Sequence, residues 1–97
     1  MRHAKMRDRN HAEIRDALRR VPGVWVRDTA DLGYGHSDLL VCVRGRILWV
    51  EIKDGEAIPS KRRLTPAEED FRAFVGANYH VVETKAEALS LILGVMP

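Results

Sequence analysis

Two acidic residues and a lysine near the middle of the chain are of types that occur together at metal-ion sites. Asp38 stands just before the apolar run 39–43, and Glu51 and Lys53 end a second apolar run, 46–53. Two carboxylates can share a hard divalent cation, which prefers oxygen ligands. The three residues therefore predict a cation site, provided that the fold brings them together.

A β-hairpin is the element that would bring them together. Both runs are rich in the β-branched and aromatic residues that suit a pleated sheet, and Arg44-Gly45 lies between them. If Arg44-Gly45 is a two-residue loop, Asp38 pairs with Glu51. Both then share a face with Trp49 and Lys53, because strand side chains alternate. Opposed carboxylates repel at a Cβ separation of about 4.5–5.5 Å, so a bound cation would relieve an unfavourable contact. A bulge at the turn would shift this register.

The same residues are also compatible with a purely structural arrangement. Asp38, Glu51 and Lys53 could form a ladder of ion pairs on a half-exposed sheet face, with no chemistry attached. Without a cation, either the repulsion raises the pKa of one carboxyl group or Lys53 neutralises part of the charge. Both interpretations stay open on the triplet alone.

The composition is that of one small globular domain covering residues 1–97. The chain has a hydrophobic fraction of 45%, a charged fraction of 31% and a net charge of +2. One cysteine excludes an internal disulfide, and the sequence has neither a membrane-spanning apolar run nor the apolar core of a signal peptide. These features predict a protein of the reducing cytoplasm without a membrane partner.

The remaining chain predicts an α/β fold with the element order αβββαβα. Apolar periodicity and capping signatures predict helices at 10–21, at 65–76 and from 84 through 93. Strands are expected at 24–28, at 79–82 and in the two arms of the hairpin. The helix between the strands at 46–53 and 79–82 makes these two strands parallel, with a right-handed crossover. The sequence thus predicts a mixed four-stranded sheet flanked by helices.

Large apolar side chains in this fold are expected to be packed. Phe71, Phe74 and Val75 recur at helical spacing and predict the buried stripe of the helix at 65–76. Trp25 and Trp49 lie in predicted strands and are expected to pack in the core or on the sheet.

Basic residues follow the acidic strand. Lys61-Arg62-Arg63 ends the aperiodic stretch 54–63, which is expected to be a loop. A local positive field can attract a polyanion to a nearly neutral protein, so this triplet predicts contact with backbone phosphates. The alternative is an ordinary solvated loop. A second basic group stands near the start of the chain: Arg2, Lys5, Arg7 and Arg9.

Ser37-Asp38, followed by Glu51-Ile52-Lys53 on the next strand, resembles the motif of the PD-(D/E)XK nucleases. With 38–41, 50–55 and Arg63-Leu64-Thr65-Pro66 added, the sequence is similar to the VRR-NUC branch of that superfamily, in particular to its small stand-alone phage and prophage members. The resemblance covers nearly the whole chain. It implies a restriction-endonuclease-like core and metal-dependent cleavage of DNA phosphodiester bonds.

The resemblance also implies roles for individual residues. Asp38 and Glu51 would bind Mg²⁺ or Mn²⁺ together with the main-chain carbonyl of Ile52. Lys53 would orient or activate the attacking water and stabilise the developing negative charge. Glu13 matches an acidic residue that related enzymes contribute from the first helix. Its alternative role is that of an exposed acid near a helix start, where the helix dipole favours it.

This sequence departs from the family pattern at two positions. Ser37 stands where the superfamily name has proline, which supplies no metal ligand. Glu68 or Glu69 stands where relatives often carry glutamine on the third helix, and either is an accessory candidate. His36, in the loop before Asp38, is expected to lie near the site.

DNA and a second copy of the chain are the partners that the resemblance implies, with no nucleotide cofactor. Stand-alone members look like dimeric junction-cleaving nucleases, so branched DNA in phage replication, recombination or repair is the expected substrate. The expected interface lies among the first helix, the strand at 24–27 and the apolar tail 91–96, with packing of that tail in its own core as the alternative. A non-cleaving DNA-binding module, or an assembly subunit of the same fold, is the alternative to a nuclease.

Overall fold

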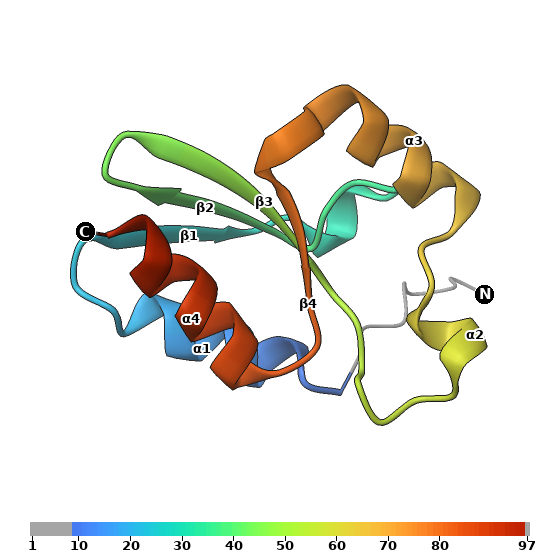
Figure 1. Ribbon diagram of the computed structural model, residues 1–97, viewed down its shortest axis with the longest axis horizontal. Helices are drawn as coiled ribbons and strands as arrows, with labels where there is room; N and C mark the ends of the chain where they lie inside the picture. The colour runs from blue at the N-terminus through green and yellow to red at the C-terminus, as the bar shows by residue number, and fades with distance from the viewer. Residues whose placement is uncertain (1–8, 97) are drawn as a thin grey trace.

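The structure is a computed structural model that describes residues 9–96. Its strands form one sheet in the order β1-β2-β3-β4, antiparallel except for the parallel β3–β4 pair. The predicted mixed four-stranded sheet flanked by helices is confirmed (Figure 1). The elements, in chain order, are α1 (His11–Arg19), β1 (Val24–Asp28), the 3₁₀ turn η1 (Ala30–Leu32), β2 (Leu39–Val43), β3 (Arg46–Ile52), α2 (Pro59–Arg62), α3 (Pro66–Val75), the 3₁₀ turn η2 (Gly76–Asn78), β4 (Tyr79–Val82) and α4 (Lys85–Val95).

The β2–β3 hairpin has the register expected from the sequence. Val43 pairs with Arg46, so Arg44 and Gly45 form the two-residue loop. Both have positive φ, 52° for Arg44 and 76° for Gly45, as a type I′ turn requires. The pairs then run without interruption along both strands. The alternation of side chains therefore continues undisturbed from the turn to the far end of the hairpin.

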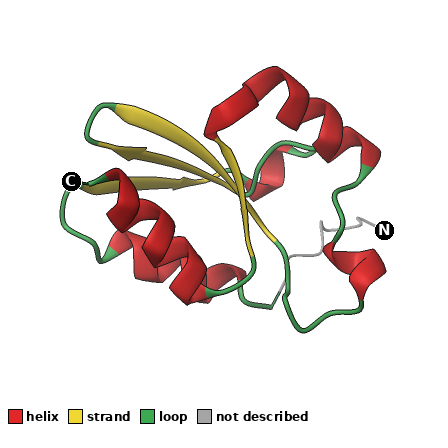
Figure 2. Ribbon diagram, in the orientation of Figure 1, coloured by secondary structure: helices red, strands yellow, loops and turns green. Residues whose placement is uncertain are grey.

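Two helices cover one face of the sheet. α1 and α4 lie side by side on that face (Figures 1 and 2), and their buried apolar residues are Ile14, Ala17, Leu18, Ala88 and Ile92. They pack on alternate residues of the central hairpin: Leu39, Val41, Val43, Leu48, Val50 and Ile52. Trp49 and Glu51 consequently point to the opposite face.

Part of the apolar tail 91–96 packs on this core. Leu91, Val95 and Met96 are partly buried and pack against the core residues. Of the two roles expected for the tail, dimer contact or packing in its own core, the second describes these three side chains.

α3 lies across the opposite face and covers only part of it. Phe71 packs against Trp49 of β3, with ring centroids 5.7 Å apart. The side of α3 that faces the sheet carries Glu68, Phe71 and Val75, and Phe74 lies outside it, at 88% exposure. The expectation that Phe74 is buried is therefore wrong.

An apolar row crosses the part of this face that α3 leaves open. Trp25 pairs with Cys42 and Cys42 with Ile47, so the three residues stand side by side on β1, β2 and β3. Trp25 is 53% exposed, and Ile47 is exposed as well. The expected packing of Trp25 is wrong, because this strand lies at the sheet edge away from α3. We call Trp25, Cys42 and Ile47 the open row.

The stretch 54–63 is not wholly a loop. It contains α2, which begins with Pro59 at the first helical position, where the missing N–H would have no intrahelical partner anyway. A single short helical turn is too brief to show an apolar period, so the sequence pattern missed it. Lys61 and Arg62 lie on this turn.

A polar cluster ties the end of β1 to α1. Asp28 Oδ2 lies 2.9 Å from His11 Nε2 and accepts a hydrogen bond of 3.1 Å from Arg15, while Oδ1 accepts one of 3.1 Å from the Ala30 N–H. Burial alone would raise the pKa of Asp28. The hydrogen bonds from His11, Ala30 and Arg15 outweigh burial and lower this pKa to about 2.

We expect Asp28→Asn to lower the free energy of unfolding by about 1–2 kcal/mol at pH 7. A lowered pKa in the folded state means that the stabilisation is complete above the ordinary value of 3.8 and is lost as the pH falls to about 2. Urea denaturation should therefore show a difference between wild type and variant that shrinks from pH 7 to pH 3. Asp70→Asn, at an exposed position of α3, is the control and should change stability little. A difference that is independent of pH would contradict the assignment.

Candidate active site

Asp38, Glu51 and Lys53 meet on the face of the hairpin that α3 covers. Leu39 pairs with Val50, so one further step along the hairpin sets Asp38 opposite Glu51. The Ile52 N–H donates a hydrogen bond of 2.8 Å to Asp38 Oδ2, which fixes the carboxylate against β3. All three charged residues are buried, at 5%, 2% and 8% exposure respectively. Burial at this level excludes the half-exposed ladder of ion pairs.

Lys53 is held between two glutamates. Its Nζ donates a hydrogen bond of 2.9 Å to Glu68 Oε1 and lies 3.6 Å from Glu51 Oε2. Glu68 is itself buried, whereas Glu69 pairs with Arg72 at 2.8 Å on the exposed surface. Of the two accessory candidates on α3, the structure brings only Glu68 to the site.

The start of α3 positions Glu68 through a capping box. Thr65 Oγ1 accepts a hydrogen bond of 3.2 Å from the Glu68 N–H, and Glu68 Oε1 accepts one of 2.9 Å from the Thr65 N–H. The same Oε1 therefore caps the helix and binds Lys53. Gly35 presses against this turn, with φ +80°, and a Cβ there would overlap the Ala67 carbonyl. The β1–β2 connection thus holds the first turn of α3 in place.

The pKa values of the two glutamates at the site, Glu51 and Glu68, are shifted in opposite directions. Burial raises the pKa of Glu51, and the charge of Asp38 and the hydrogen bond with Glu68 raise it further, to about 10. Burial would also raise the pKa of Glu68, but hydrogen bonds from Lys53 and the Thr65 N–H outweigh burial and lower it. The pKa of Glu51 is therefore raised while that of Glu68 is lowered, so Glu51 binds a proton more strongly than Glu68 does when no cation is bound.

The donor set fits a hard divalent cation. Glu51 Oε1 is buried and has no hydrogen-bond partner, so a bound cation would satisfy this acceptor. The N–H and C=O of one strand residue point toward the same neighbouring strand. Because the Ile52 N–H is directed toward Asp38 at the start of β2, the Ile52 carbonyl is directed to that side as well. Residues 9–96 contain no cluster of three or more His, Cys, Asp or Glu side chains arranged as a metal cage. The pair Asp38 and Glu51 would leave the other positions to water and substrate, as Mg²⁺ prefers.

His36 lies beside the site as part of an aromatic cluster. Its ring centroid is 4.7 Å from that of Phe71 and 5.5 Å from that of Trp49, and its Nδ1 lies 3.0 Å from the Ser37 carbonyl oxygen. The ring contacts place His36 as a packing residue between the β1–β2 connection and α3. A role in binding stays a prediction.

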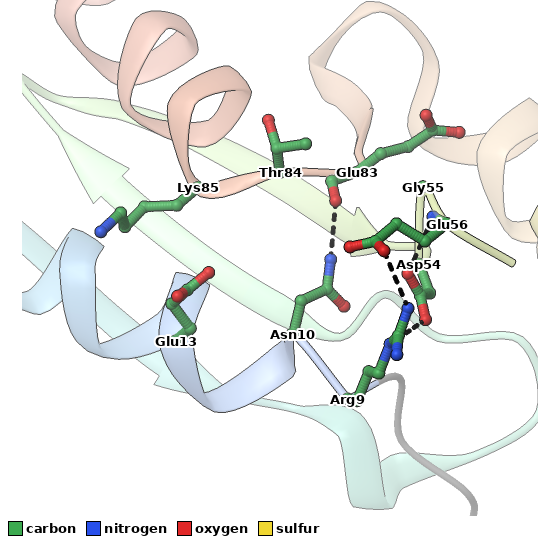
Figure 3. Close-up of a pocket in the computed structure, with 9 residues that line it drawn as sticks. All are labelled: Arg9, Asn10, Glu13, Asp54, Gly55, Glu56, Glu83, Thr84 and Lys85. Atoms are coloured by element: carbon green, nitrogen blue, oxygen red, sulfur yellow. Dashed lines mark hydrogen bonds and ion pairs between the residues drawn. The ribbon is translucent and has the colours of Figure 1, made fainter.

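Glu13 does not lie on the sheet face that carries Asp38 and Glu51. It is exposed on α1, which covers the opposite face of the sheet, and it lines a separate pocket with Asp54, Glu83 and Lys85 (Figure 3). This pocket has a volume of about 510 Å³. The catalytic role implied for Glu13 by the family resemblance stays a prediction.

Asn10 is a supporting residue that the sequence analysis missed. Its side-chain amide donates to the Lys53 carbonyl at 3.2 Å. It also donates to the Glu83 carbonyl at 2.7 Å, a contact drawn in Figure 3. It thereby joins the start of α1 to the ends of β3 and β4, next to Lys53. An asparagine before a helix normally indicates an N-cap, but Asn10 makes no side-chain cap hydrogen bond. Only the tertiary structure reveals the alternative partners.

The basic triplet after the acidic strand is only partly available for contact. Lys61 and Arg63 are exposed, whereas Arg62 is half-buried, with one guanidinium nitrogen 4.0 Å from Glu83. Of the N-terminal basic group, Arg9 pairs with Asp54 at 2.6 Å. Arg2, Lys5 and Arg7 lie outside the described residues.

The hairpin with two facing carboxylates and a lysine, within this sheet order, defines a fold of the PD-(D/E)XK nuclease type. A solved structure described as a VRR_NUC domain is 33% identical to this chain, and the match covers 84% of this chain and 85% of that chain, with a TM-score of 0.53. This chain belongs to the VRR-NUC family, as the sequence resemblance predicted. No family model and no curated protein matches the chain. None of the helices within residues 9–96 is long and apolar enough to cross a membrane.

We expect Glu51→Gln to raise the melting temperature in the presence of a chelator. A carboxyl group whose pKa is raised on folding contributes stability below its ordinary value, 4.5, and loses that stability as the pH rises toward the folded value near 10. The glutamine variant should therefore be more stable than wild type at pH 8, by on the order of 1–3 kcal/mol, and the gain should shrink at pH 5. Glu69→Gln, at an exposed position of the same charge type, is the control. A lower melting temperature for Glu51→Gln at pH 8 would argue against the repulsion between Asp38 and Glu51.

Proposed function

We propose that this protein hydrolyses DNA phosphodiester bonds with the help of Mg²⁺ or Mn²⁺. The observation that carries the proposal is the buried Asp38–Glu51 pair, in which Glu51 Oε1 has no hydrogen-bond partner and Glu51 Oε2 lies 3.6 Å from the Lys53 ammonium. Membership in the VRR-NUC family supports the same activity. A module that only binds DNA gains nothing from burying two acids beside a polyanion, so cleavage explains the site better.

The chain supplies orientation and charge. A bound divalent cation would neutralise the phosphate and lower the pKa of the attacking water. Asp38 presents a carboxylate whose direction is fixed by the Ile52 N–H. Lys53 contributes a positive charge beside the reacting phosphate, where it stabilises the charge that develops in the transition state. Glu68 sets the position of that ammonium through the 2.9 Å contact.

Exposed basic residues that follow Lys53 along the chain would hold the DNA backbone. Lys61 and Arg63 are exposed on and after α2, a short distance along the chain from Lys53. Contacts of this kind give affinity for phosphates without reading the base sequence. Selectivity for a branched structure, as expected in phage replication, recombination or repair, would come from the arrangement of two protomers.

We expect Lys53→Ala to slow cleavage by on the order of 100–1,000-fold. The assay uses labelled linear and branched DNAs with Mg²⁺, with Mn²⁺ and with chelator, and chelator should abolish cleavage by wild type. DNA binding, measured by fluorescence anisotropy, should change little because Lys53 acts in the transition state. Lys85→Ala removes an exposed lysine at the separate pocket and serves as the control. Cleavage by Lys53→Ala at a near-normal rate would refute the assignment, and absence of cleavage by wild type would leave a binding module as the function.

The proposal includes a homodimer formed through the open row. Trp25 on β1 and Ile47 on β3 are large, exposed apolar side chains, and Cys42 on β2 lies between them. Two-fold pairing of this surface with itself would bury both and would present two active sites to two DNA strands. One protomer alone offers a single site and little surface for a duplex.

We expect light scattering at micromolar concentration to give twice the chain mass of 11.0 kDa. Trp25→Arg should shift the mass toward that of a single chain, because a charged side chain in the open row opposes its burial. Phe74→Arg alters an equally apolar exposed residue on α3 and should leave the mass unchanged. A mass of one chain at all concentrations would exclude the dimer.

A further inference from the structure

Tyr79, at the start of β4, places a phenol inside the molecule without a hydrogen-bond partner. The residue is 8% exposed, and its hydroxyl oxygen is buried and unpaired among the described residues. Buried hydroxyl groups nearly always have a partner, since leaving one unpaired is destabilising. Phenylalanine would fill the same space without this penalty. Packing of the core therefore does not explain why this position carries a hydroxyl group.

The position of Tyr79 connects it with the active site. β4 runs parallel to β3, with Tyr79 paired to Trp49 and Val81 paired to Glu51. Tyr79 is therefore on the same face of the sheet as Glu51, one pair away on the neighbouring strand. Its ring centroid is 6.0 Å from that of Phe71, so the side chain lies between the sheet and α3. The ring thus borders the carboxylate cluster from the β4 side.

The hydroxyl stays protonated beside this cluster. Burial raises the pKa of Tyr79, and the charges of Glu51, Glu68 and Asp38 raise it further. A neutral phenol offers one O–H donor. The site thus holds two buried, unpartnered atoms on one face, an acceptor at Glu51 Oε1 and a donor at Tyr79. A ligand with an oxygen atom near the Tyr79 hydroxyl and a positive charge near Glu51 Oε1 would satisfy both atoms.

We propose that Tyr79 is an active-site residue whose hydroxyl donates a hydrogen bond to a phosphate oxygen of the DNA strand being cut. The inference rests on the proposed nuclease function and adds a residue to it. Phosphate oxygens are strong acceptors that gain negative charge during hydrolysis, so a donor fixed in a buried position stabilises the transition state more than the ground state.

The first test compares Tyr79→Phe with Tyr34→Phe in single-turnover cleavage at saturating DNA and Mg²⁺. The two positions are the only tyrosines of the sequence, and Tyr34 is fully exposed in the β1–β2 connection. We expect Tyr79→Phe to cleave about 10–100-fold more slowly with an unchanged or higher melting temperature. Tyr34→Phe should cleave at the wild-type rate. Wild-type cleavage by Tyr79→Phe would overturn the inference and leave the nuclease function standing.

A second readout does not depend on cleavage. In Tyr34→Phe protein labelled with 3-fluorotyrosine, Tyr79 gives the only fluorine signal, and DNA is added together with Ca²⁺ in place of Mg²⁺. A phosphate oxygen at the hydroxyl should shift this signal on saturation with DNA, and Ca²⁺ alone should not reproduce the shift. An unmoved signal would overturn the inference even if Tyr79→Phe is slow or unstable. If wild type cleaves no DNA, the proposed nuclease function fails. The fluorine measurement still shows in that case whether Tyr79 contacts a DNA phosphate.

Discussion

The ion pair between Lys53 and Glu68 is the contact on which the arrangement of the site depends. It joins the end of the acidic strand to the first turn of α3, two segments that the sheet alone would not hold together. Because the same glutamate oxygen also caps the helix, the start of α3 and the position of the lysine are determined by one atom. A buried lysine next to a buried acid pair is costly in isolation. The capping box makes the geometry rigid enough for the cluster to persist.

The two-residue turn of the hairpin is the second constraint. Strand side chains alternate, so one added residue would move Asp38 to the face that α1 and α4 cover, away from Glu51. The turn is tight because Arg44 accepts a positive φ before Gly45. Local strain at an exposed arginine thus fixes the register on which the site rests.

Most of the framework followed from local pattern. The hairpin register, the element order and the capping box at Thr65 are encoded in short stretches, each with its own physical signature. The sequence pattern did not show α2, which is too short to be periodic. It predicted burial of Phe74 from helical spacing and packing of Trp25 from its place in a strand. Partial cover of a sheet by one helix is a tertiary property that periodicity does not report. The same limit applies to Asn10 and Tyr79, whose significance depends on partners distant in sequence, and to the choice between Glu68 and Glu69, which only the rotation of α3 decides.

Gly35 gives the fold an unusual point of sensitivity. Gly35 has no side chain that could bind a metal ion, yet its backbone touches the first turn of α3 at a point where a methyl group would not fit. The distance between the sheet and α3 therefore depends on the absence of a side chain at Gly35. A Cβ at this position would push the first turn of α3 away from the sheet. Glu68 would then move away from Lys53, although every charged residue of the site would still be present in the chain.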